Sequence, residues 1–252
     1  MKLKYLFRTR FGEILTEFLP PAHGKDAKVV ILCPGAPSGP SYRPVVEFLA
    51  RKGFWVFSMR YRGSWESGGT FMNRSPEKDV LEIVKQLPHG FKDLFGGKKY
   101  KLKPSAIYVF GLSFGGPAAI LAVRDPRVTA AVAISSVIDW RVPAKEESID
   151  WTARYVSEAF GGAYRGPRKN WMKLKTGTFY NPATQAARID GSKLLLFHAK
   201  DDRIAPFRPA VKFAKATGAS LALQRSGGHL KSSFIMKPTA WKKIARFLKK
   251  NS

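Results

Sequence analysis

Apolar and polar stretches alternate along this chain in a way that predicts strands and helices in turn. Short apolar runs indicate buried strands at 27–33, 54–59, 107–110, 128–135 and 193–198, with a further strand at 219–224. Segments with apolar residues on one side indicate helices at 41–52, 77–87, 209–217 and 238–250. An opening hairpin is expected from strands at 2–9 and 12–19. This alternation implies an α/β fold, a mainly parallel twisted sheet with helices on both faces.

The sharpest change of pattern lies between Ala106 and Ala122. An apolar strand runs into the pentapeptide Gly111-Leu112-Ser113-Phe114-Gly115, and helix-forming residues follow. In this strand–turn–helix context G-x-S-x-G holds a serine in a strained turn, beside free helix N–H groups that can stabilise an oxyanion. Ser113 is therefore a candidate nucleophile. The alternative is a glycine-rich connection that contains an incidental serine.

Residues 140–189 interrupt the alternation. They are rich in aromatic residues, with Trp140 and Trp151 among them, and contain several glycines and prolines. We interpret this segment as an insertion that forms a small cap, helical around 148–160. No repeat or linker divides the remainder, so we expect one domain over 1–252.

Composition and charge further restrict the class of protein and its expected location. The 252 residues are 44% hydrophobic, enough to bury one large core. The single cysteine, Cys33, excludes an intramolecular disulfide and fits a reducing cytosol. Without a signal-peptide core or a membrane-spanning run, we expect a cytoplasmic protein without membrane association. The net charge of +26 predicts salt-sensitive, nonspecific binding to polyanions, but no nucleic-acid-binding module is recognised.

Four patches along the chain resemble the α/β-hydrolases. Within that group the chain is most similar to the catalytic domain of the prolyl-oligopeptidase family and its stand-alone esterase relatives. The patches are 33–40, 60–71, 111–116, and 198–206 followed by 227–229. The resemblance implies the α/β-hydrolase fold, hydrolysis by a serine nucleophile, and no metal or organic cofactor. The order nucleophile, acid, histidine distinguishes this group from other serine hydrolases.

The resemblance also indicates the partners of the serine. His229, in a Gly-Gly-His loop after the last strand, is expected to act as general base. A carboxylate in the loop after the preceding strand should orient the imidazole, and both Asp201 and Asp202 lie there. A gap-free alignment with the family's HGxxDxxVP pattern selects Asp202, whereas alignment on the family's DDRV run selects Asp201. We prefer Asp202 because both flanking anchors, His198 and Pro206, agree with it.

Two backbone amides are expected to form the oxyanion hole. One belongs to Phe114, directly after the nucleophile, and the other to Ala36, in a loop that matches the family's HGGP except for Pro34 in place of the histidine. Tyr61, Trp140 and Trp151 are expected to line the substrate pocket. Tyr61 could instead brace the loop that contains Ala36.

These residues together predict a Ser-His-Asp hydrolase that works through an acyl-enzyme. The chain lacks the N-terminal propeller that filters substrates in the peptidase relatives, so we expect carboxylic esters of small molecules as substrates. Short peptides are the alternative within the same chemistry. A different class, a non-catalytic protein of the same fold that binds polyanions, is motivated by the net charge of +26.

Overall fold

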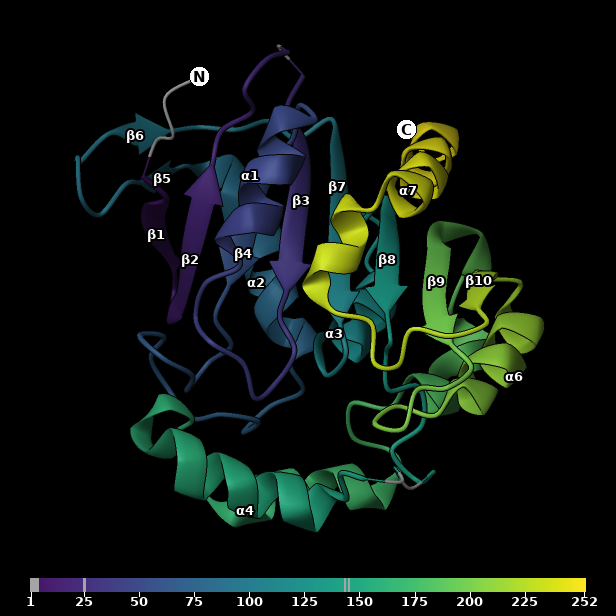
Figure 1. Cartoon of the computed structure of the whole chain (residues 1–252). Helices are drawn as coiled ribbons and strands as arrows, with labels where there is room; N and C mark the ends of the chain where they lie inside the picture. Colours follow the sequence, from purple (N-terminus) through teal and green to yellow (C-terminus); the bar gives the residue numbers. More distant parts are fainter. Residues whose placement is uncertain (1–4, 25, 143, 145) are drawn as a thin grey trace.

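A computed structural model describes residues 5–24, 26–142, 144 and 146–252. Its centre is an eight-stranded twisted sheet with strand order β1-β2-β4-β3-β7-β8-β9-β10 (Figure 1). The strands are Phe7–Phe11 (β1), Ile14–Leu19 (β2), Lys28–Cys33 (β3), Trp55–Met59 (β4), Ala106–Leu112 (β7), Ala130–Ile134 (β8), Leu194–Ala199 (β9) and Ser220–Gln224 (β10). Strand β2 pairs antiparallel with β1 and β4, and the other pairs in this sheet are parallel. The predicted α/β fold is confirmed.

Helices cover both faces of the sheet (Figure 1). Alternate residues of each central strand face opposite ways, so Val30 and Leu32 join a core beneath α1 and α7, whereas Val29 and Ile31 join a core beneath α2, α3 and α6. The helices are Arg43–Arg51 (α1), Glu77–Gln86 (α2), Gly115–Ala122 (α3), Ile149–Phe160 (α4), Arg168–Met172 (α5), Phe207–Thr217 (α6) and Pro238–Lys250 (α7). Short 3₁₀ helices are Leu87–His89, Gly161–Ala163, Lys173–Thr176, Pro182–Arg188, Gly191–Lys193 and Ser232–Met236.

The sequence pattern predicts that Ser41 caps the helix at 41–52 and that a polar, lysine-rich connection fills 88–104, and the structure corrects both predictions. Ser41 does not cap α1, because the cap position is occupied by Tyr42 and the Ser41 hydroxyl donates to Glu17 Oε2 at 2.9 Å. The polar connection 88–104 is not simply a loop, since it forms a small antiparallel hairpin from Phe91–Lys92 (β5) and Lys99–Tyr100 (β6). At Ser41 a contact 24 residues away decides the local structure, whereas the hairpin consists of two strands too short to leave a periodic pattern.

The segment expected to form a cap, 140–189, lies across the carboxyl ends of the central strands, with α4 at the bottom of Figure 1. Ser148 caps α4 by accepting a hydrogen bond from the N–H of Trp151. The segment is attached to the loop after β4 by the N–H of Trp65, which donates to the carbonyl of Ala163 at 2.7 Å. This position leaves the predicted catalytic residues between the sheet and α4.

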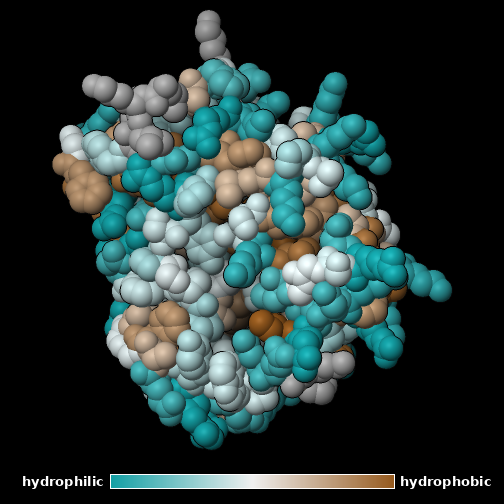
Figure 2. Space-filling view, viewed as in Figure 1, coloured by the Kyte–Doolittle hydropathy of each residue, from teal (hydrophilic) through white to brown (hydrophobic). Residues whose placement is uncertain are grey.

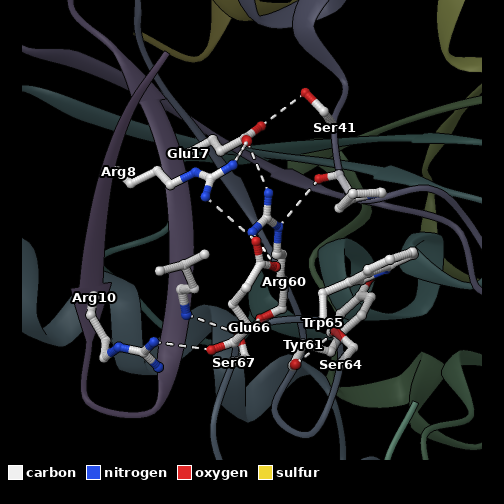
Figure 3. Close-up of polar contacts among 12 residues, drawn as sticks. Arg8, Arg10, Glu17, Ser41, Arg60, Tyr61, Ser64, Trp65, Glu66 and Ser67 are labelled. Atoms are coloured by element: carbon white, nitrogen blue, oxygen red, sulfur yellow. Dashed lines mark hydrogen bonds and ion pairs between the residues drawn. The ribbon is translucent and has the colours of Figure 1, made fainter. Parts of the chain in front are cut away.

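The loop after β4 closes on itself through buried charges (Figure 3). Arg60 is 2% exposed and pairs with Glu17, Nη2 to Oε1 at 2.9 Å, and with Glu66. Its Nε donates to the carbonyl of Pro40, while its own carbonyl accepts from the hydroxyl of Ser67. The loop is thereby held against β2, so its charged groups point into the scaffold.

The face shown in Figure 2 is mostly hydrophilic, with hydrophobic residues gathered in small patches. Within the part of the chain that the structure describes, no helix is both long enough and apolar enough to cross a membrane.

Candidate active site

Ser113 lies at the turn between β7 and α3 with a φ of 51°, a left-handed conformation that is strained for a residue with a side chain. Its N–H donates to the carbonyl of Ile134 at 2.9 Å. A Cβ on Gly111 would lie 2.3 Å from the carbonyl oxygen of Gly115, and one on Gly115 would lie 2.3 Å from that of Cys33. The turn therefore requires both glycines, as predicted, and it projects Ser113 from the carboxyl edge of the sheet.

The structure brings Asp202 to the imidazole of His229. Nδ1 of the ring lies 2.9 Å from Oδ2 and 3.1 Å from Oδ1 of the carboxyl group. Burial favours the neutral form of Asp202, but the hydrogen bond and charge of His229 and the N–H of Ala205 outweigh it and lower the pKa of the carboxyl group. An ionised carboxylate only accepts, so Nδ1 carries the proton and Nε2 is left with a lone pair.

Asp201 has a different role. Its two carboxyl oxygens accept from the N–H groups of Gly227 and Gly228, at 3.1 and 2.9 Å. These glycines directly precede His229, so Asp201 holds the loop while Asp202 contacts the ring. Of the two aspartates left open by the sequence, the preferred one occupies the position beside the imidazole.

Ser113 and His229 border the same cavity, which has a volume of about 460 Å³. Among the described residues, Ser113 Oγ and His229 Nε2 have no hydrogen-bond partner, and they do not bond to each other. Catalytic hydrogen bonds of this kind are often long before substrate binds and shorten in the complex. Both residues therefore border the space that a substrate carbonyl group could enter.

Two residues beside the pair position it. His198 is buried, and its Nε2 lies 2.7 Å from the carbonyl of Ala205 and 3.5 Å from Oδ2 of Asp202. Ser135 was not identified from the sequence. Its hydroxyl accepts from the N–H of Leu230 at 3.0 Å, so it holds the residue that directly follows His229, and it also helps to lower the pKa of Asp202. Its location directly after β8 is the only signal that the sequence offers.

The amides proposed for the oxyanion hole flank Ser113. Ala36 and Phe114 both border a second cavity together with Ser113, and among the described residues neither amide N–H has an acceptor within the protein. Gly35 lies close behind, since a Cβ there would be 3.5 Å from Cβ of Ser113. Tyr180, missed by the sequence analysis, donates from its hydroxyl to the carbonyl of Phe114 at 2.6 Å and fixes the other side of the turn.

Tyr61 does not line a pocket at this site, contrary to the expectation. It is 2% exposed, its hydroxyl donates to the carbonyl of Pro34 at 2.8 Å, and its ring centroid lies 5.5 Å from that of Phe114. Burial of the phenol raises its pKa well above the usual value. Tyr61 is thus a brace for the loop that contains Ala36, because its hydroxyl finds an acceptor only on the buried side.

Two cavities meet at the serine. We call the first, of about 230 Å³, the Trp140 cavity, and the second the His229 cavity. The Trp140 cavity is lined by Phe114, Val137, Trp140, Ile149, Trp171 and Leu174. The His229 cavity is lined by Tyr42, Trp151, Tyr155, Phe160, His229 and Lys231. Both share Ala36, Ser113, Glu147 and Ile204. Trp140 and Trp151 therefore border the site, each in a different cavity.

No group of three His, Cys, Asp or Glu side chains within the described ranges is arranged to hold a metal ion. Cys33 is buried at the end of β3 and its Sγ lies 3.8 Å from Sδ of Met59. Burial raises the pKa of its thiol, which keeps the sulfur neutral and unreactive. The groups at this site that can act as nucleophile or base are therefore hydroxyl oxygens and imidazole nitrogens.

Known proteins place this geometry in context. No curated protein is significantly similar in sequence. An esterase of Pyrococcus furiosus shares the fold, with 21% identity, a TM-score of 0.66, and coverage of 94% of this chain and 86% of that one. An acylaminoacyl peptidase of Pyrococcus horikoshii aligns with 16% identity, a TM-score of 0.63, and coverage of 96% of this chain but 40% of that one.

A puromycin-hydrolysing peptidase of Mycobacterium tuberculosis also shares the fold, with 16% identity, a TM-score of 0.69, and coverage of 97% of this chain and 39% of that one. At these identities the likeness concerns the fold. The sequence itself matches the prolyl oligopeptidase family over residues 40–248, which is most of the chain. This protein therefore belongs to the prolyl oligopeptidase family of serine hydrolases and has the α/β-hydrolase fold.

Proposed function

We propose that this protein is an esterase that cleaves carboxylic esters of small molecules, with Ser113, His229 and Asp202 as its catalytic triad. The observation that carries the proposal is the 2.9 Å contact between His229 Nδ1 and Asp202 Oδ2, on a ring that borders the same cavity as Ser113. That arrangement supports a base aimed at the nucleophile by an ionised carboxylate.

The reaction follows from the positions of these groups. Nε2 of His229 accepts the proton of the Ser113 hydroxyl as Oγ attacks the ester carbonyl. The N–H groups of Ala36 and Phe114 donate to the oxygen that becomes negative. The bond from the carbonyl carbon to the alcohol oxygen then breaks, and His229 returns its proton to that oxygen. Water attacks the acyl-serine in the same way, which releases the acid and restores Ser113.

The cavities favour small esters as substrates. The Trp140 cavity, at about 230 Å³, is below the roughly 300–1,000 Å³ of pockets that take drug-sized ligands. The cap segment also covers the edge of the sheet where Ser113 lies, which limits the length of chain that can cross the site. The membership of peptidases in the same family keeps short peptides as the second candidate.

The test compares two bond types in one protein. The purified chain, freed of nucleic acid, is given p-nitrophenyl acetate and butyrate beside an aminoacyl p-nitroanilide, with Ser113→Ala as the control for each. Ester turnover that disappears in the variant supports the proposal, whereas efficient anilide turnover supports the peptidase. If neither substrate turns over and a fluorophosphonate fails to label Ser113, the catalytic proposal is wrong and a binding role for the basic surface takes its place.

A further inference from the structure

The proposed mechanism indicates which cavity holds the acyl group of the ester and which holds its alcohol. His229 must reach the oxygen of the departing alcohol to return the proton, so the leaving group lies on the side of the imidazole. Only the His229 cavity includes that ring, although Ser113 and Ala36 border both. The acyl group therefore lies in the Trp140 cavity, and the alcohol lies in the His229 cavity.

Aromatic side chains form one wall of the His229 cavity. Trp151 and Tyr155, four residues apart on α4, stack with ring centroids 4.9 Å apart and planes 12° apart. They are 44% and 41% exposed, unusual for rings that pack together, and both border the cavity with Phe160 and Tyr42. Their faces and edges are available to a ligand. The negative face of an aromatic ring attracts a cation.

Glu147 supplies a charge at the same place. It borders both cavities, and its pKa is raised above the ordinary value, chiefly by burial; the charge of His229 lowers it, and the charges of Glu146 and Asp202 raise it further. Among the described residues it has no ion pair or hydrogen bond. The carboxylates on either side of it are neutralised, Glu146 by Arg203 and Asp150 by Lys175. In a chain with 44 basic and 18 acidic residues, a carboxylate that borders both cavities with Ser113 and has no partner among the described residues is a selective feature.

A cation is present nearby but does not neutralise Glu147. Lys231 borders the His229 cavity, is exposed, and forms no ion pair with Glu147 in the described structure. The space between Glu147 and the aromatic pair therefore offers one negative charge and two ring surfaces. An ammonium group is the chemical group that both attract.

We propose that the His229 cavity binds a leaving group that carries a protonated or quaternary amine, with Glu147 as its counter-charge and Trp151 and Tyr155 as its aromatic wall. The substrate class is then the ester of an amino alcohol with a short acid. This inference rests on the proposed function, because it uses the direction of bond cleavage. The chemistry is unchanged: the acyl–oxygen bond breaks and the amino alcohol leaves with the proton from His229.

The test uses two esters that differ in one atom. Butyrylcholine carries a quaternary nitrogen where 3,3-dimethylbutyl butyrate carries carbon, so the pair has the same shape and acyl group. At about 0.15 M salt, where screening over about 8 Å suppresses the distant positive surface, we expect kcat/KM to be about tenfold higher for the choline ester. Glu147→Gln should bring this ratio close to one, and Trp151→Leu should lower it about threefold.

Glu158→Gln is the matched control, because it removes the same charge from α4, the helix that begins two residues after Glu147, at a position outside both cavities. It should keep the ratio of the unaltered protein. A ratio near one before any substitution, with Ser113-dependent turnover of the neutral ester, overturns the inference and leaves the esterase proposal intact. A ratio that survives Glu147→Gln overturns the role of Glu147. If neither ester is cleaved while p-nitrophenyl butyrate is cleaved in a Ser113-dependent way, the inference is wrong and the esterase proposal stands; if p-nitrophenyl butyrate is not cleaved either, both are wrong.

The acyl side is tested separately. The p-nitrophenyl ester of 4-aminobutyrate carries an ammonium group where that of pentanoate carries a methyl group. We expect the pentanoate ester to be cleaved at least as fast. A marked preference for the aminobutyrate ester would place the cation in the Trp140 cavity and overturn the assignment of the leaving-group side.

Discussion

Two loops at the carboxyl edge of the sheet carry ionisable residues, and they use them in opposite ways. In the loop after β4, each guanidinium nitrogen of Arg60 has a partner, from Glu17, Glu66 or the carbonyl of Pro40 (Figure 3). In the loop after β10, His229 is bonded through Nδ1 to Asp202, while Nε2 has no partner among the described residues and borders a cavity. A polar cluster whose members are all paired supports a structure, whereas one with an unpaired group facing a cavity can react.

The most damaging change for activity should be Ser113→Ala. Removing the nucleophile of a triad costs on the order of 10⁶ in kcat. The side chain is small and the strained turn stays occupied by a residue with a Cβ, so the free energy of unfolding should change by less than about 1 kcal/mol. Steady-state kinetics and urea unfolding of the same preparation check both parts. Retention of more than about a hundredth of the activity would contradict the role of Ser113.

The next largest loss of activity is expected from substitutions of the two neighbouring aspartates. Asp202→Asn should lower kcat by about 10⁴, because an amide no longer fixes the tautomer or stabilises the imidazolium ion. Asp201→Asn keeps one acceptor for the glycine N–H groups and should cost less than about tenfold. The two variants are compared on p-nitrophenyl butyrate. Equal losses of kcat in the two variants would contradict the different roles assigned to the two carboxyl groups.

Breaking the ion pairs of Arg60 in the loop after β4 should lower the stability of the protein and leave its catalytic rate nearly unchanged. Glu17→Ala leaves the Arg60 guanidinium buried with one carboxylate partner fewer, which should lower the free energy of unfolding by about 3–5 kcal/mol. The kcat of the folded fraction should stay within about threefold of the unaltered value. Glu47→Ala is the control, since its i,i+4 pair with Arg43 is partly exposed and is worth about 0.3–0.5 kcal/mol. Similar losses in both variants would refute the distinction.

The smallest effect is expected for an ion pair at the surface, between Asp139 and Arg141. The hydrogen bonds and charge of Arg141, opposed by partial burial, lower the pKa of Asp139 from its ordinary value to about 2. Because the pKa is lower in the folded state, this contribution is present above pH 4 and is lost as the pH falls towards 2. Arg141 is exposed, so solvent screening should keep it below about 1 kcal/mol.

Chemical unfolding between pH 2 and 7 tests this. Asp139→Asn should lower stability slightly at pH 7 and have a smaller effect near pH 2, where about half of the carboxyl groups of the folded, unaltered protein are protonated. A larger loss at pH 2 than at pH 7 would reverse the expected sign.

Most elements of the fold could be predicted because their signals are local. The apolar run of β7 and the glycines around Ser113 act within a few residues, since β-strand burial and the tight turn depend on neighbours in sequence. The helix around 148–160 was found for the same reason, as α4 over Ile149–Phe160. The hairpin of β5 and β6 was missed because two short strands in a lysine-rich segment leave no periodic pattern.

The sequence by itself determined which elements form and in what order, and it restricted the catalytic acid to two adjacent residues. Only the tertiary structure decided between them, because the contact of His229 with Asp202 joins loops 27 residues apart whose geometry depends on Asp201 and Ser135. It also turned Tyr61 inward, to an acceptor on Pro34, and placed Glu147 at the junction of the two cavities, where the part of the chain that the structure describes gives it no partner. Hydrogen bonding and burial depend on distances in space, and a strand pattern does not encode those distances for the loops it connects.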